Sequence, residues 1–118
     1  MRLDHIGVWV RDLDAVAAFY ARYFDARVGD LYENPRKGFR SRFLIIGEGA
    51  RLELMTRTDV TAVSMGETTL GLAHVALIVG DEAAVDALAA RLRSEGHAIL
   101  DGPRRTGDGY YECVVCDR

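Results

Sequence analysis

The sequence repeats one pattern, in Leu3-Asp4-His5-Ile6-Gly7-Val8-Trp9-Val10 and, 69 residues later, in Leu72-Ala73-His74-Val75-Ala76-Leu77-Ile78-Val79. Each copy has a histidine at its third position, followed by the apolar and β-branched residues that are typical of a strand. In each case an aspartate, Asp12 or Asp81, then stands where a helix N-cap is expected. An internal repeat of this kind indicates a chain built from two similar modules.

The elements that follow the two copies also correspond. Apolar residues recur at three- and four-residue steps over 13–24, which predicts a helix with one buried face. A weak strand over 28–33, a polar loop over 34–38 and strands over 39–46 and 51–55 complete the first unit. After the second copy we expect a helix that ends at Gly96, strands over 97–100 and 110–116, and a polar loop over 101–109.

We therefore predict an α+β fold, in which two βαβββ modules in tandem form a curved mixed sheet around a shared cavity. Residues 1–118 would be a single domain, with module one at 1–57, a linker at 58–70 and module two at 71–118. The second module reaches Arg118 where the turn toward its fourth strand is expected. Its last strand is therefore predicted to be missing from this sequence.

Composition sets the general class of protein. The 118 residues are 49% hydrophobic and 28% charged, which is ordinary for one globular domain. The net charge of -3 gives no long-range attraction for nucleic acid or an anionic membrane. The apolar runs are too short to span a bilayer, and the first residues lack the apolar stretch of a signal peptide. We expect a cytoplasmic protein that binds neither nucleic acid nor membrane.

The two cysteines, Cys113 and Cys116, form a C-x-x-C pattern that also occurs in redox and zinc sites. Here they fall in a predicted strand, where residues three apart point to opposite faces. We expect two ordinary buried thiols.

The chain resembles the vicinal oxygen chelate superfamily, which includes glyoxalase I, bleomycin-resistance proteins and extradiol dioxygenases. The segments that carry the resemblance are Leu3–Val8, Arg51–Met55, Leu72–Ala76 and Gly107–Glu112. The resemblance implies a divalent metal ion (Ni, Zn, Mn, Co or Fe) held by His5, Glu53 and His74. A fourth ligand is expected near position 122, beyond the end of this sequence. Two imidazoles and a carboxylate leave open positions at such an ion for neighbouring oxygens of a substrate.

We expect three further residues at the substrate pocket. Glu112, on the last predicted strand, is a candidate for contact with the substrate or the metal ion. Trp9 and Arg57 are candidates for contact with the substrate. In glyoxalase I an arginine and an asparagine that help to bind glutathione follow two of the ligands by four residues, where this chain has Trp9 and Arg57.

The basic residues of the two loops (Arg36, Lys37, Arg40, Arg42, Arg104 and Arg105) are expected to be solvated, with binding of an anionic ligand as the alternative. His97 is expected at the surface.

The resemblance favours a metal-dependent lyase or isomerase that acts on a small oxygen-chelating substrate. Its catalytic base would be Glu53 or the last-strand glutamate expected near position 122. Glutathione is not expected to be the specific cosubstrate. The alternatives are a drug- or metabolite-binding protein of the bleomycin-resistance type and a ring-cleaving dioxygenase. Most relatives pair, and their sites may combine residues of both chains, so a homodimer is expected.

Overall fold

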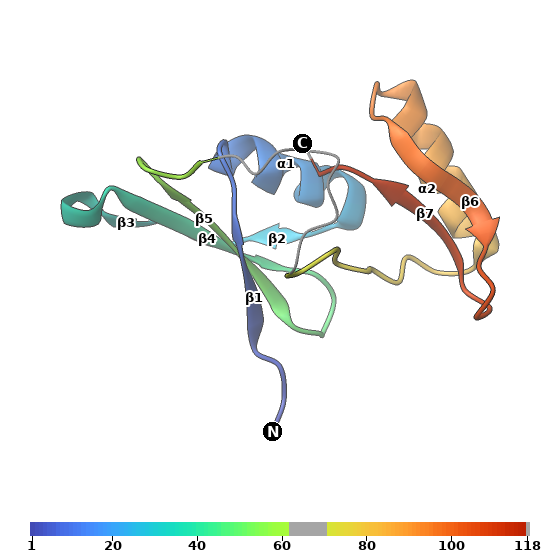
Figure 1. The fold of residues 1–118 in the computed structure, drawn as a ribbon, viewed down its shortest axis with the longest axis horizontal. Helices are drawn as coiled ribbons and strands as arrows, with labels where there is room; N and C mark the ends of the chain where they lie inside the picture. The colour runs from blue at the N-terminus through green and yellow to red at the C-terminus, as the bar shows by residue number, and fades with distance from the viewer. Residues whose placement is uncertain (62–70, 118) are drawn as a thin grey trace.

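The computed structural model describes residues 1–61 and 71–117 and has the α+β architecture that the sequence predicts (Figure 1). The stretch predicted as module one, called the first module below, contains β1 (His5–Trp9), α1 (Leu13–Phe24), β2 (Arg27–Val28), β3 (Tyr32–Asn34), a 3-10 turn (Pro35–Lys37), β4 (Phe39–Ile45) and β5 (Arg51–Arg57). The second contains α2 (Glu82–Ser94), β6 (Ile99–Arg105) and β7 (Tyr111–Val115). In the part of the chain that is described, no helix is long and apolar enough to cross a membrane.

The strands of the first module form one sheet in the order β1-β5-β4-β2, and β3 also pairs with β4. β1 runs parallel to β5, whereas the pairs that β4 makes with β2, β3 and β5 are antiparallel. The weak strand predicted over 28–33 is two short strands, and the loop predicted over 34–38 is largely the 3-10 turn. The parallel pair joins the first and last strands of the module, so that His5 and β5 lie next to each other.

Helix α1 begins and ends as the sequence predicts. The Asp12 carboxylate accepts a hydrogen bond of 2.9 Å from the Ala15 N–H, and Asp25 takes a left-handed conformation with φ of 51° at the C-cap. The helix packs against one face of the sheet, where three leucines are 0–4% exposed. The buried helix residues are Leu13, Val16, Ala17, Phe19, Tyr20 and Tyr23, and the leucines are Leu44, Leu52 and Leu54.

The second module differs from the prediction in its hairpin. β6 extends through Arg105, although residues 101–109 were expected to be a polar loop. Pairing with β7 explains the difference, because Asp101 lies opposite Val114 and Arg104 opposite Glu112. The register shifts around Gly102, whose φ of 78° suits a residue without a side chain.

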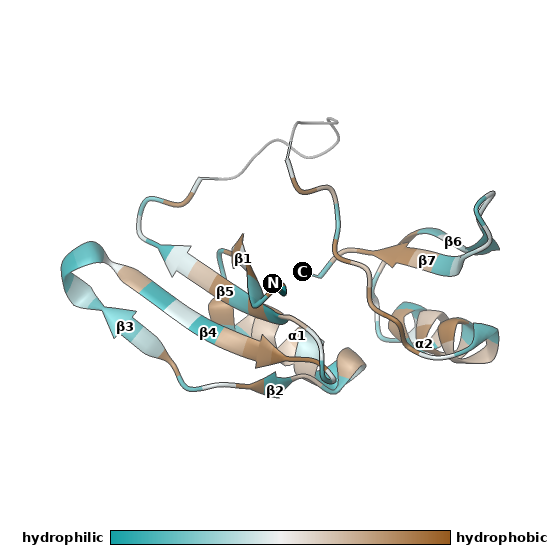
Figure 2. Ribbon diagram, turned by 90° about the horizontal axis from the view of Figure 1, so that it is seen from below, coloured by the Kyte–Doolittle hydropathy of each residue, from teal (hydrophilic) through white to brown (hydrophobic). Residues whose placement is uncertain are grey.

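The predicted strand over residues 72–79 is not formed in the single chain. The segment pairs with no other described strand, yet Val75 and Leu77 pack against the core while their neighbours are exposed. Figure 2 shows it as a mostly hydrophobic stretch that leads into α2. The side-chain alternation of a strand is therefore present, but the hydrogen-bonded partner is not found among the described residues.

The two modules lie toward opposite ends of the long axis and meet at the C-terminal ends of α1 and α2 (Figure 1). Leu92 of α2, 1% exposed, belongs to the same core cluster as the residues of α1. The radius of gyration is 15.4 Å, larger than the roughly 13.5 Å expected of a compact domain of this length. The five-stranded sheet and the β6–β7 sheet are separate, so the predicted curved sheet around a shared cavity is not formed within the described part of one chain.

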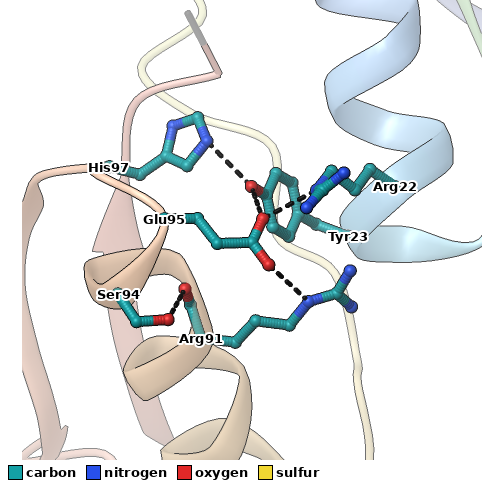
Figure 3. A network of polar contacts seen from close by, with 6 residues as sticks. All are labelled: Arg22, Tyr23, Arg91, Ser94, Glu95 and His97. Atoms are coloured by element: carbon teal, nitrogen blue, oxygen red, sulfur yellow. Dashed lines mark hydrogen bonds and ion pairs between the residues drawn. The ribbon is translucent and has the colours of Figure 1, made fainter.

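A polar network ties the modules together where they meet (Figure 3). The Glu95 carboxylate accepts hydrogen bonds from Arg22 Nε at 2.7 Å and from the Tyr23 hydroxyl. Arg91 adds a contact of 3.3 Å to the same carboxylate. These hydrogen bonds, with Arg22 first and Tyr23 second, lower the pKa of Glu95 to about 2.

His97 joins this network and is not simply a surface residue. Its Nε2 lies 3.0 Å from the Tyr23 hydroxyl, and its ring packs edge-on against Phe19 with the centroids 5.1 Å apart. Because the Tyr23 hydrogen points to Glu95, His97 Nε2 must be the donor toward the Tyr23 oxygen. The expectation that His97 is a surface residue is wrong, because its partners come from α1.

Candidate functional site

The face of the sheet that α1 leaves uncovered carries the candidate site. In the strand register His5 lies opposite Arg51, and Glu53 lies opposite both Gly7 on β1 and Phe43 on β4. Side chains of paired residues share a face, and successive residues alternate between faces. The inward places on β5 belong to Leu52 and Leu54, so Glu53 points to the open face.

His5 and Glu53 come together on this face. His5 Nε2 lies 3.7 Å from Glu53 Oε2, and the two side chains are 41% and 18% exposed. An imidazole nitrogen and a carboxylate oxygen this close can bind one divalent ion with little movement, and both are ordinary ligands of such ions. The pair therefore fits two of the three metal ligands that the resemblance implies.

The other nitrogen of His5 is also engaged. Asp4 Oδ2 lies 2.9 Å from His5 Nδ1 and accepts a hydrogen bond of 2.5 Å from Arg51 Nη2. The hydrogen bonds from His5 first, and then from Arg51, hold the pKa of the Asp4 carboxyl below its usual value. A hollow of about 390 Å³ borders Asp4 and Arg51.

Phe43 packs against both basic side chains of this cluster. The Arg51 guanidinium carbon lies 4.6 Å from the centroid of the Phe43 ring, and the His5 ring meets the same ring edge-on at 5.2 Å. Sequence reasoning did not single out Asp4, Arg51 or Phe43 as site residues. The signal available for Asp4 was an acidic residue immediately before a candidate ligand.

His74 does not join His5 and Glu53 within one chain. It is exposed, in the segment that pairs with no described strand. Over residues 1–61 and 71–117, no group of three or more His, Cys, Asp or Glu side chains is placed to hold a metal ion. The assignment of His5, Glu53 and His74 as one ligand set therefore stays a prediction.

The three residues predicted for the pocket lie in different places. Trp9, 50% exposed at the end of β1, meets Phe39 edge-on with the ring centroids 6.1 Å apart. Arg57, at the end of β5, forms an ion pair of 2.5 Å with Asp59. Glu112 is exposed on β7, in the second module. Trp9 lies on the same strand as His5 and Arg57 on the same strand as Glu53, whereas Glu112 belongs to the other sheet.

Gly7 of β1 lies opposite Glu53 on the open face. A Cβ atom added to Gly7 would lie 2.8 Å from Met55 Cε, the mobile end of a side chain on the adjacent strand. The stretch of β1 between His5 and Trp9 is thus bordered by a methionine methyl group.

Most of the basic residues that were candidates for binding an anion form ion pairs with carboxylates of this chain. Arg42 contacts Asp14 and Arg104 contacts Asp101, at 3.2 and 2.6 Å. Arg40 lies 3.2 Å from Glu33, and Arg105 pairs with Glu82. These pairs leave fewer basic side chains available for an anionic ligand, although Arg42, 24% exposed, is not fully solvated. Both cysteines are free and half-buried.

A family model of the Glyoxalase/Bleomycin resistance protein/Dioxygenase superfamily matches residues 2–118 of the chain. No curated protein sequence matches it. Among solved structures, a glyoxylase/bleomycin resistance protein/dioxygenase domain from Frankia sp. superposes with a TM-score of 0.74 at 20% identity, over 91% of this chain and 82% of that one.

Two further structures are similar. The trypanothione-dependent glyoxalase I of Leishmania major has a TM-score of 0.73 at 24% identity, over 99% of this chain and 87% of that one. A fosfomycin resistance protein of Listeria monocytogenes, in complex with Mn(II) and a dihydroxypropylphosphonic acid, has a TM-score of 0.70 at 23% identity, over 98% and 82%. At these identities the structures establish the fold alone, whereas the family model spans nearly the whole sequence. The chain belongs to the Glyoxalase/Bleomycin resistance protein/Dioxygenase superfamily, the vicinal oxygen chelate proteins.

Proposed function

We propose that this protein is a metal-dependent lyase or isomerase that acts on a small substrate with two neighbouring oxygens. The observation that carries the proposal is the 3.7 Å approach of His5 Nε2 to Glu53 Oε2 on an accessible sheet face. Membership of a superfamily with glyoxalase I and a Mn(II)-binding resistance protein among its structural neighbours is consistent with it.

The roles of the side chains follow from their chemistry. A bound divalent ion supplies a positive charge that polarises a substrate carbonyl and acidifies the adjacent C–H. His5 would hold such an ion at the open face through the lone pair of Nε2. Glu53 is the carboxylate nearest to that position, and we assign it the role of the base that takes the proton and returns it to the neighbouring carbon.

We assign the third ligand to His74 of a second copy, in a homodimer. The apolar segment 72–79 pairs with no described strand and exposes Ile78 almost completely, at 98%. A second copy that pairs with this segment would satisfy its backbone and cover its apolar side chains. The same contact would bring His74 to the other chain's His5 and Glu53, which the single chain does not do.

Metal binding by the full chain tests the ligand set. Calorimetric titration with Ni(II), Zn(II), Mn(II), Co(II) and Fe(II) under anaerobic conditions should show at least one that binds, with affinity lost in His5→Ala and Glu53→Gln. His97→Gln, which changes the one histidine outside the set, should bind as the unaltered protein does. If no metal binds, a non-catalytic drug- or metabolite-binding protein becomes the better assignment.

Mixed dimers test where His74 acts. Chains carrying His5→Ala are combined with chains carrying His74→Ala, and heterodimers are purified through two affinity tags. If each site spans two copies, one of the two sites has both histidines, and each heterodimer should bind one metal ion. If each site lies within one chain, neither site is intact and no metal should bind.

The substrate is tested with the metal-loaded protein. Hemithioacetals of methylglyoxal with several thiols should reveal turnover. With the same metal added, Glu53→Gln should turn them over at least about a hundredfold more slowly, because this variant lacks both a metal ligand and the base. Because Trp9 and Arg57 stand where glyoxalase I has glutathione-binding residues, the glutathione adduct should be a poor substrate. Efficient turnover of that adduct would contradict this part of the proposal.

A further inference from the structure

Asp4 and Arg51 form a charged pair directly beside the candidate ligand His5. We propose that Asp4, held in place by Arg51, is a positioning residue that fixes the hydrogen of His5 on Nδ1 and leaves the Nε2 lone pair free for a metal ion. This inference rests on the proposed function for its metal, while its statement about the imidazole stands on the contacts of the single chain.

The hydrogen-bond chemistry leaves one arrangement for a neutral His5. An ionised carboxylate only accepts hydrogen bonds, so the contact of 2.9 Å between Asp4 Oδ2 and His5 Nδ1 requires a hydrogen on Nδ1. A neutral imidazole carries one hydrogen, and Nε2 is then left with its lone pair. Nε2 is the nitrogen that faces Glu53 at 3.7 Å.

Arg51 keeps the carboxylate of Asp4 available for this task. Its Nη2 donates to the same Oδ2 atom that contacts His5. It also supplies a positive charge, so that Asp4 does not add an uncompensated second carboxylate charge near Glu53. Without Arg51 the Asp4 side chain, 57% exposed, would be free to turn into water.

Phe43 packs against the imidazole ring of His5 and restricts its rotation. Its ring lies edge-on to His5 and under the Arg51 guanidinium, at centroid distances of 5.2 and 4.6 Å. Histidines that bind metals usually donate the second ring N–H to a carboxylate, which sets both the tautomer and the orientation of the ring. Asp4, Arg51 and Phe43 together provide that support for His5.

An exposed ion pair of no consequence is the competing interpretation, since such pairs usually contribute little to stability. The two interpretations differ in their effect on the imidazole. An exposed pair without a positioning role would leave the tautomer of His5 unchanged when Asp4 is removed. A positioning residue would not.

The tautomer is measured directly in metal-free protein. Long-range proton–nitrogen correlation spectra are recorded on the full chain, with ¹⁵N-labelled histidine, about two pH units above the ordinary histidine pKa of roughly 6.5. In the unaltered protein His5 should be mainly in the Nδ1–H form. In Asp4→Ala the Nε2–H form, which unrestrained histidine prefers, should become the major one.

A matched control is available in the second module. Asp101 is also about half exposed and pairs with an arginine, Arg104, at 2.6 Å. Asp101→Ala should leave the His5 signals unchanged. A His5 that is in the Nε2–H form in the unaltered protein, or a tautomer ratio that Asp4→Ala does not change, would overturn the proposal.

Metal affinity gives the second readout. Loss of such a carboxylate typically weakens metal binding about 10–100-fold, and we expect Asp4→Ala to fall in this range while Asp101→Ala binds normally. If the unaltered protein binds no metal, the proposed function fails, and the tautomer spectra still decide whether Asp4 positions His5. If metal binds and Asp4→Ala has normal affinity, the positioning role is refuted and the proposed function is retained.

Discussion

The two copies of the repeated pattern adopt different structures in the same chain. The first copy becomes β1, which pairs along its length with β5. The second, residues 72–79, keeps the side-chain alternation of a strand, with Val75 and Leu77 packed inward, but pairs with no described strand. The pattern of apolar residues thus determines which side of a segment is buried. Whether the backbone forms a sheet depends on a second strand that the pattern does not contain.

The largest expected difference between the copies is in hydrogen exchange. β5 is paired on both sides, with β1 and β4, so its amides should exchange only when the module unfolds. At concentrations where light scattering shows single chains, the amides of residues 74–79 should exchange at least about a thousandfold faster than those of β5. Protection of 74–79 that rises with protein concentration would place the missing strand in a second copy. Equal protection in single chains would contradict the comparison.

Replacement of buried leucines tests whether the two modules fold as one unit. Leu54 of β5 and Leu92 of α2 are each 1% exposed and belong to one core cluster. Leu54→Ala and Leu92→Ala should each lower the free energy of unfolding by about 3 kcal/mol, in a single cooperative transition in urea. Leu100→Ala, at a site that is 61% exposed, should change it by less than about 0.5 kcal/mol. Two separate transitions would show that the modules unfold independently.

The smallest expected effect is the pH dependence of the contact between the modules. The pKa of Glu95 is lowered from 4.5 to about 2 in the folded protein, so the folded state binds this proton less readily than the unfolded state. The stabilisation by Glu95 is therefore fully present above pH 4.5 and is lost as the pH falls toward 2. In urea titrations over this range, Glu95→Gln should lose less stability than the unaltered protein. An equal loss in both proteins would show that the ionised Glu95 carboxylate does not stabilise the contact between the modules.

Sequence reasoning predicted the helices best, because their signals are local. The Asp12 and Asp81 caps both form as expected, each with a hydrogen bond to the N–H three residues on. The second half of β6 was missed because Asp101, Gly102 and Pro103 are typical of a loop, so the strand predicted over 97–100 was too short. Only the pairing with β7, which sequence composition does not reveal, keeps these residues in a strand.

The candidate site was predicted in part. The repeat and the family resemblance pointed to His5 and Glu53, and the parallel pairing of β1 with β5 brings these residues together. The role of His97 was missed because its partner Tyr23 lies 74 residues earlier in the chain. No local pattern indicates a contact between side chains so far apart. Asp4 was also missed, although it lies next to His5 in the sequence. An acidic residue beside a histidine does not by itself indicate that the two side chains are hydrogen-bonded.

The absence of a side chain at Gly7 leaves space on the open face that the Met55 side chain borders. The atom bordering it is Met55 Cε, at the end of an unbranched thioether side chain, and such side chains change rotamer readily. The space in front of Gly7 is therefore bordered by a side chain that can change rotamer rather than by backbone. Any side chain at position 7 would force the Met55 methyl group to move, so the rotamer of Met55 depends on the absence of a side chain at Gly7.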